Sequence, residues 1–275
     1  MELKKAKETE LLEELSRRGY ISTRDRDIKQ DLIYPIEIGQ RERVGVVSDT
    51  HLGSMYQQLS HLIRFYRLCK RLKITKVFHA GDLIEGNGKL YRGQLYEMFL
   101  HGAGPQRDYV INHYPKIPGI TTYFIGGSHD YSFYKETGYD VLEDIARQRP
   151  DMKYLGMFGA YLKQKNIIIY LMHGSGGNAY ARSYKMQKII EQFAPEKKPH
   201  ILLLGHYHVP CHLSGYRNVE GFQLPCFQAQ TPYLKAKGLY PFIGGEIVEW
   251  THNKKGTTSF RYETIPFYVV DQGDF

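Results

Sequence analysis

Between residues 43 and 208, short apolar runs rich in β-branched residues alternate with longer stretches that have helical spacing. The apolar runs are continuous, which is typical of strands buried on both faces of a sheet that lies between helices. The expected strands are 43–51, 74–82, 121–130, 166–174 and 200–208, and the expected helices are 59–72, 139–148 and 181–193. This alternation predicts an α/β fold.

The two ends of the chain follow other patterns. Leu11, Leu12 and Leu15 share one helical face and are followed by Gly19, a helix stop. We expect residues 1–32 to form an N-terminal helical arm that packs or makes a homo-oligomer, in preference to a remnant of a helix-turn-helix. Residues 33–275 would form the main domain. Near its end, "GGEIVEW" (244–250) and "TTSFRYE" (257–263) predict a β-hairpin.

The composition indicates which partners and which cellular location to expect. The net charge of +8 favours polyanionic partners such as nucleic acid, although a merely basic protein has the same charge. The longest apolar run is far shorter than the ~20 residues of a membrane helix, so no membrane association is expected. The first residues do not resemble a secretion signal. Three widely spaced cysteines favour neither disulfides nor a thiolate zinc site, and a cytoplasmic location is expected.

Five expected strands end in carboxylates or imidazoles. These residues are Asp49 and His51, Asp82, His129 and Asp130, His173, and His206 with His208. Sites in open α/β sheets form outside the carboxyl ends of the strands, so we expect these side chains to converge. One polar residue at a strand end is ordinary, but five such ends with only these residue types are not explained by chance.

The residue types indicate a metal site. Imidazole and carboxylate without thiolate suit divalent ions such as Mn, Fe and Zn. Alternate residues of an extended segment project to the same side, so "DTH" would aim Asp49 and His51 at one site. In "HYH", His206 and His208 would do the same, or each would bind one of two adjacent ions.

As a set, these motifs resemble the calcineurin-like metallophosphoesterase superfamily. Its pattern is D-x-H, G-D, G-N-H-[DE], a histidine before a small residue, and G-H-x-H. Here the same order is found as "SDTH", "AGD", "GSHD", "MHG" and "GHYH", from residue 49 to residue 208. The resemblance implies a four-layer α/β/β/α sandwich and a metal-dependent phosphoric ester hydrolase.

The resemblance also implies two divalent ions, with Mn favoured over Fe, Zn, Mg and Ni. Carried over to this chain, the first ion would be held by Asp49, His51 and His208. Asp82 would bridge both ions, and His173 and His206 would hold the second. The Asn that completes the second site in the family is replaced by Ser128. A serine hydroxyl is shorter and a poorer donor than an amide oxygen, so this position weakens the expected second site.

His129 matches the catalytic histidine of the family. By that resemblance, a hydroxide bound by both metals attacks phosphorus, and protonated His129 stabilises the developing charge and protonates the leaving oxygen. An acid partner would keep His129 charged and oriented, and Asp130 and Glu85 are both candidates.

The preferred substrate is a nucleic-acid phosphodiester, which would make the protein a nuclease. This expectation is based on the charge, the arm and the insertion 86–116, which carries Arg92. In a second segment, residues 173–188, a glycine-rich turn leads into a helix whose N-terminus would offer backbone N–H groups to a phosphate. Candidate substrate contacts in the second segment are Arg182, Tyr184 and Lys185. The chain is also similar to poorly characterised phosphoesterases of phages and bacteria, which implies a DNA-related setting.

Two alternatives stay open. One is a phosphatase or phosphodiesterase that acts on small nucleotides or phosphoproteins. The other is a catalytically weak module that binds nucleic acid or a protein partner, and it is motivated by Ser128.

Overall fold

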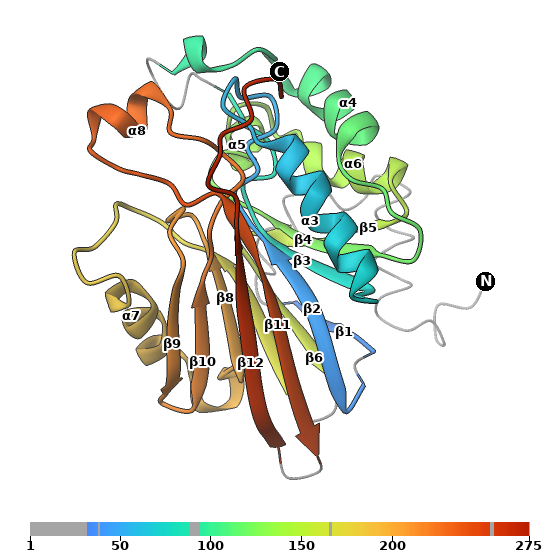
Figure 1. Cartoon of the computed structure of the whole chain (residues 1–275), viewed down its shortest axis with the longest axis vertical. Coiled ribbons are helices and arrows are strands. Elements are labelled where there is room, and N and C mark those ends of the chain that lie inside the picture. The colour runs from blue at the N-terminus through green and yellow to red at the C-terminus, as the bar shows by residue number, and fades with distance from the viewer. Residues whose placement is uncertain (1–31, 38, 88–93, 165–166, 254–255, 275) are drawn as a thin grey trace.

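The computed structural model describes residues 32–37, 39–87, 94–164, 167–253 and 256–274. Within them, two six-stranded sheets pack face to face, and helices cover the outer face of each sheet (Figure 1). This is a four-layer α/β/β/α sandwich, so the expected fold is confirmed. The expected N-terminal arm lies almost wholly outside the described residues.

The first sheet is named here the β2 sheet. Its strands are β2 (Arg41–Val47), β3 (Lys76–Ala80), β4 (Thr121–Gly126), β5 (Met152–Met157), β11 (Gly244–Asn253) and β12 (Gly256–Pro266). Their order is β12-β11-β2-β3-β4-β5, in which β2 to β5 run parallel. The strands β11 and β12 pair antiparallel, which confirms the expected C-terminal hairpin.

The second sheet is named the β7 sheet. Its strands are β1 (Ile33–Pro35), β6 (Gly159–Gln164), β7 (Ile167–His173), β8 (Ile201–Gly205), β9 (Cys211–Tyr216) and β10 (Val219–Gln223). Their order is β1-β6-β7-β8-β10-β9, with β7, β8 and β10 parallel. The alternation of strands and helices in the sequence did not show that the strands divide between two sheets.

Of the helices in the described residues, four lie on the side of the β2 sheet and one covers the β7 sheet (Figure 1). The first four are α3 (Leu59–Arg71), α4 (Ala103–His113), α5 (Tyr131–Thr137) and α6 (Val141–Gln148), and the fifth is α7 (Tyr184–Gln192). Short helical turns complete the described chain: η1 (Leu95–Glu97), η2 (Pro195–Lys197) and α8 (Pro232–Ala236). No helix among the described residues is long and apolar enough to cross a membrane.

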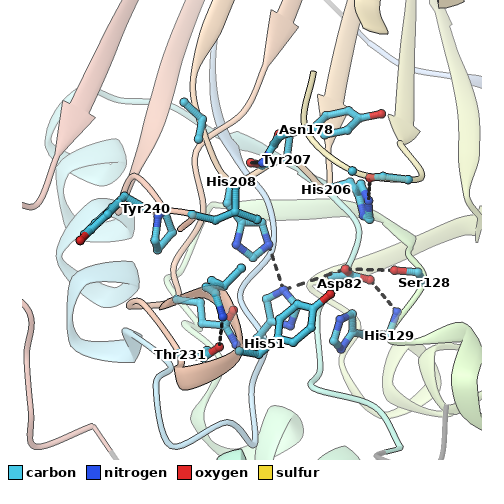
Figure 2. Close-up of a pocket in the computed structure, with 18 of the residues that line it drawn as sticks. His51, Asp82, Ser128, His129, Asn178, His206, Tyr207, His208, Thr231 and Tyr240 are labelled. Carbon is cyan, nitrogen blue, oxygen red and sulfur yellow. Dashed lines mark hydrogen bonds and ion pairs between the residues drawn. The ribbon is translucent and has the colours of Figure 1, made fainter. Parts of the chain in front are cut away.

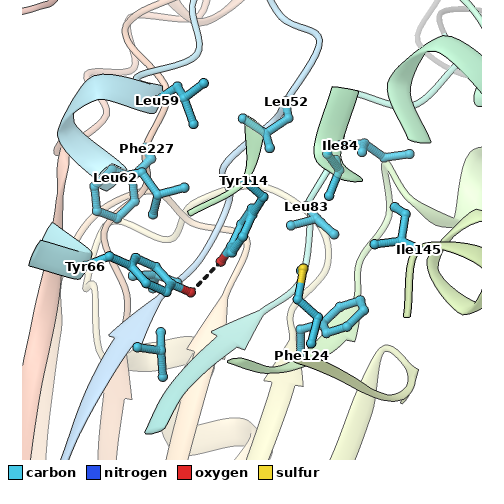
Figure 3. Close-up of a cluster of buried hydrophobic side chains, with 14 of the residues drawn as sticks. Leu52, Leu59, Leu62, Tyr66, Leu83, Ile84, Tyr114, Phe124, Ile145 and Phe227 are labelled. Atoms are coloured by element: carbon cyan, nitrogen blue, oxygen red, sulfur yellow. Dashed lines mark hydrogen bonds between the residues drawn. The ribbon is translucent and has the colours of Figure 1, made fainter. Parts of the chain in front are cut away.

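The cores follow the periodicity of each element. Helix α3 buries Leu62, Phe65, Tyr66 and Cys69 against the β2 sheet, at the spacing of one helical face. Tyr66 brings a hydroxyl into this core, and it hydrogen-bonds to the Tyr114 hydroxyl at 2.8 Å (Figure 3). A second core fills the space between the sheets, and a third lies under α7. All three cysteines are free thiols, as expected.

One acid interrupts the core between the sheets. Glu246 shares the inner face of β11 with Val248 and Trp250 and is 3% exposed. Its Oε1 accepts a 3.5 Å hydrogen bond from Thr264, whereas Oε2 finds no partner among the described residues. Burial raises the pKa of Glu246 to about 8. A carboxyl group that is protonated in the fold and ionised when unfolded makes stability fall as pH rises.

We therefore expect Glu246→Gln to stabilise the protein at high pH. In the wild type, the free energy of unfolding should decrease as the pH rises from the ordinary glutamate pKa to about 8, because the unfolded chain releases this proton first. Each pKa unit corresponds to about 1.4 kcal/mol, so a gain on the order of 1 kcal/mol or more is expected for the variant at about pH 8. Urea unfolding at about pH 5 and pH 8 measures the difference, and an equal effect at both pH values would contradict this account.

Candidate metal centre

Both sheets contribute to one site, at the edge where their parallel strands end (Figure 2). The loops after β2, β3 and β4 meet the end of β7 and the loop after β8. The two edges touch at Gly205, where a Cβ atom would collide with the carbonyl oxygen of Ala80. The expected convergence of the strand ends is therefore what the structure shows.

The backbone at the predicted ligands is unusual. Of the nine non-glycine residues with positive φ in the described chain, five are predicted ligands: Asp49 (51°), His51 (45°), Asp82 (53°), His206 (89°) and His208 (58°). The assumption that "DTH" and "HYH" are extended was therefore wrong. The chain turns sharply after each strand, and the turn after β2 is held by hydrogen bonds from Asp49 N–H to Gly81 O and from His51 N–H to Asp82 O. Such conformations cost about 1–3 kcal/mol each and cluster at functional sites.

The first group of ligand atoms comes from Asp49, His51 and His208. The Nε2 atom of His208 lies 3.2 Å from Asp49 Oδ1 and 3.2 Å from His51 Nε2. The other ring nitrogen of His51, Nδ1, lies 3.1 Å from Glu85 Oε2. A hydrogen bond between these two groups would fix the tautomer that presents Nε2 to a metal.

The second group comes from Asp82, His173 and His206. His173 Nε2 lies 3.1 Å from Asp82 Oδ2, and its Nδ1 donates to the Ala80 carbonyl oxygen at 2.9 Å. The same Asp82 oxygen is 3.9 Å from His51 Nε2 in the first group. Asp82 therefore lies between the two groups, the position expected for a bridging ligand.

The charges of this cluster fit divalent cations. Asp49 and Asp82 are buried, and their ion pairs among the described residues are with histidines only. Burial opposes ionisation of Asp49, but His208 and His173 together outweigh burial and lower the pKa of this carboxyl. Burial lowers the pKa of His51 to about 4, which keeps its ring neutral and able to bind a metal. The Asp82 carboxylate overcomes the effect of burial and raises the pKa of His173 to about 9, so a bound cation would replace a proton on this ring and stabilise the same carboxylate.

Ser128 and His129 follow β4 and line the same cleft. Ser128 Oγ lies 3.5 Å from Asp82 Oδ2, so the hydroxyl reaches the bridging carboxylate (Figure 2). The backbone N–H of His129 donates to Asp82 Oδ1 at 2.8 Å. This approach requires Gly127, because a Cβ atom there would collide with Asp82 Oδ1. The His129 ring stands edge-on to His51, with ring centroids 4.5 Å apart.

Of the two candidate acid partners, Glu85 lies next to His129. His129 Nδ1 donates to the backbone carbonyl of Glu85 at 2.6 Å, and the Glu85 carboxylate lies 4.0 Å from the same nitrogen. Burial raises the pKa of Glu85 to about 7. The Asp130 carboxylate instead accepts backbone N–H groups from Leu83, Ile84 and Gly127, at 2.8 to 3.1 Å. This geometry gives Asp130 a part in holding the loops after β3 and β4.

The cleft above these residues has a volume of about 680 Å³. Of the predicted substrate contacts, Arg182 lines it, whereas Tyr184 and Lys185 begin α7 and do not. Arg92 lies outside the described residues. Sequence reasoning missed Tyr180, Tyr233 and Tyr240, which also line the cleft, because the 23 tyrosines of the chain gave no reason to single them out.

Comparison with known proteins bears on the site directly. The family model of calcineurin-like phosphoesterases matches residues 42–236, a range that includes every predicted ligand. No significant match was found among curated protein sequences.

The chain also matches solved structures, among them those of three proteins. A conserved predicted phosphoesterase from Streptococcus pneumoniae is 16% identical, with 83% of this chain and 100% of that chain covered and a TM-score of 0.39. Vps29 from Entamoeba histolytica, in complex with zinc, is 13% identical, with coverages of 82% and 98% and a TM-score of 0.39. The nuclease MPE of Pseudomonas putida is 15% identical, with coverages of 68% and 76% and a TM-score of 0.34.

These structural similarities are too low to add to the assignment, which is based on the sequence match. That match spans more than half of the chain and both ligand groups. The chain therefore belongs to the calcineurin-like phosphoesterase family.

Proposed function

We propose that the protein is a phosphodiesterase with two divalent metal ions and that its substrate is nucleic acid. The observation that carries the proposal is the pair of ligand groups with Asp82 between them, beside His129 and below an open cleft. Asp49, His51 and His208 would hold one ion, and His173 and His206 the other. When bound, two such ions would neutralise the phosphate oxygens and lower the pKa of a water molecule. Mn is the preferred ion.

His129 would protonate the leaving oxygen. Its Nδ1 donates to the Glu85 carbonyl, so Nε2 is the nitrogen that would have to deliver the proton to a substrate. Burial lowers the pKa of His129, whereas Asp82 and Glu85 oppose this effect. A phosphate anion in the cleft would favour the protonated ring further, which is the form that a general acid needs.

The positive charge of the protein makes nucleic acid the preferred substrate. The chain carries a net charge of +8, and Arg182 places a cation in the lining of the cleft. Lys and Arg side chains attract a phosphate backbone and release its counterions.

A cytoplasmic location agrees with the three free thiols.

The first test is hydrolysis of bis-p-nitrophenyl phosphate and p-nitrophenyl phosphate with Mn. We expect the diester to be the better substrate and activity to be lost on chelation and restored by added metal. A nuclease assay with single- and double-stranded DNA and RNA, across Mn, Mg and Zn, then tests the substrate. Faster hydrolysis of the monoester would favour the phosphatase, and salt-sensitive DNA binding without turnover would favour the binding module.

The second test is His129→Gln. Loss of a general acid typically costs about 10²–10⁴-fold in rate, so kcat for the diester should fall by that order while bound metal stays unchanged. His113→Gln is the matched control, because this histidine is exposed on α4 and does not line the cleft. A kcat within a few-fold of wild type would remove His129 from the proposed mechanism.

Ser128 generates a third prediction. The hydroxyl contacts Asp82 but reaches less far than an amide would. We expect Ser128→Asn to tighten binding of the second ion without affecting the first, as measured by calorimetric titration of the metal-free protein. Ser175→Asn, at an exposed position outside both ligand groups, is the control. Identical titrations for Ser128→Asn and wild type would show that Ser128 does not limit the second site.

A further inference from the structure

Two protruding segments border the cleft, and neither contains a residue of the ligand groups. Residues 176–182, between β7 and α7, are named here the first lip, and residues 231–241, which include α8, the second lip. Both line the cleft, and in Figure 1 the loop before α7 and the segment with α8 lie on the same side of the molecule. Figure 2 places Asn178 of the first lip and Tyr240 of the second around the metal-ligand histidines.

The lips are held in place by hydrogen bonds. In the first lip, the Gly176 carbonyl is hydrogen-bonded to His206 Nε2 at 2.8 Å, and Asn178 donates to the Tyr207 carbonyl. In the second lip, Thr231 caps α8, and the backbone N–H of Tyr233 donates to Glu97 Oε1 at 2.7 Å. Surfaces held in this way lose little conformational entropy when a ligand binds.

Each lip presents tyrosine rings to solvent. Tyr180 at the tip of the first lip is fully exposed, and Tyr233 and Tyr240 of the second are 45% and 76% exposed. All three line the cleft. The ammonium group of Lys237 lies 6.0 Å from the centre of the Tyr233 ring. Open aromatic faces with a cation nearby are the elements on which proteins stack unpaired bases.

The lips and the residues next to them in sequence carry charge of one sign. The stretches 174–187 and 224–245 contain four cationic residues and no acid: Arg182, Lys185, Lys235 and Lys237. Among the described residues, none of the four forms an ion pair with an acid. Lys185, Lys235 and Lys237 stand outside the lining of the cleft, where phosphates on either side of a bound nucleotide would lie. A strand has phosphates on both sides of a base, whereas a mononucleotide does not.

We infer that the two lips bind single-stranded nucleic acid, with bases stacked on Tyr180 and Tyr233 and flanking phosphates beside the lysines. The inference rests on the phosphodiesterase activity proposed above and names its substrate class. In a duplex the base faces are covered by neighbouring pairs, so the exposed rings would have no base to stack on. A flexible strand also bends easily enough to bring one phosphate to the buried ligand groups at the base of the cleft.

Fluorescence anisotropy tests the inference directly. The probe is a short fluorescein-labelled phosphorothioate DNA strand, which resists hydrolysis, and it is titrated with the Mn-loaded protein. Stacking is worth about 1–3 kcal/mol per base, so Tyr180→Ala and Tyr233→Ala should each raise the Kd about 5-fold or more. The corresponding Phe variants keep the ring and should bind within about twofold of wild type. Tyr262→Ala, on β12 outside the cleft, is the matched control.

Each outcome has one meaning. Tighter binding of the strand than of its duplex, together with losses in the two Ala variants but not in Tyr262→Ala, supports the inference. Equal binding of strand and duplex, or Ala variants that bind like wild type, would overturn it, as would a deoxymononucleotide that competes as well as the strand. Hydrolysis of bis-p-nitrophenyl phosphate by the wild type is measured in parallel. If that hydrolysis is absent, the proposed function fails by itself, whatever the strand binding shows.

Discussion

The structure depends on a group of buried carboxylates that, among the described residues, form ion pairs with histidines and with no lysine or arginine. Asp49 and Asp82 are 0% and 1% exposed, and their partners among the described residues are histidines. Burial of charge is costly even where histidines pair with it, and strained backbone at the same residues adds to that cost. Divalent cations would relieve both, because they bind the carboxylates directly and hold the left-handed turns in place.

The rest of the fold brings these side chains to one point. Parallel strands in each sheet deliver their carboxyl ends to the same edge, and Gly205 lets the two edges come into contact. Asp130 ties the loop after β3 to the loop after β4 through three backbone amides. The ligands are thus set by regular secondary structure, whereas the two lips that border the cleft come from connections between elements. This division lets one metal centre serve different substrates, because only the lips need to change.

Much of this arrangement could be predicted from the sequence. Continuous apolar runs predicted the strands that carry the site, which are β2, β3, β4, β7 and β8. The residues at their ends predicted the ligands, because parallel strands end at a common edge. Two features could not be predicted in that way. The division into two sheets depends on which strands pair, and apolar runs do not encode pairing. The left-handed turns at Asp49 and His208 are imposed by the neighbouring loop, and no local residue such as glycine announces them.

The central claim is that the two ligand groups hold two adjacent divalent ions. Anomalous diffraction from crystals grown with Mn tests it most directly. The account predicts two peaks for each chain, one among Asp49, His51 and His208 and one among Asp82, His173 and His206, with the Asp82 carboxylate between them. Crystals that diffract well and show no anomalous density at either group, at a saturating concentration of Mn, would contradict it.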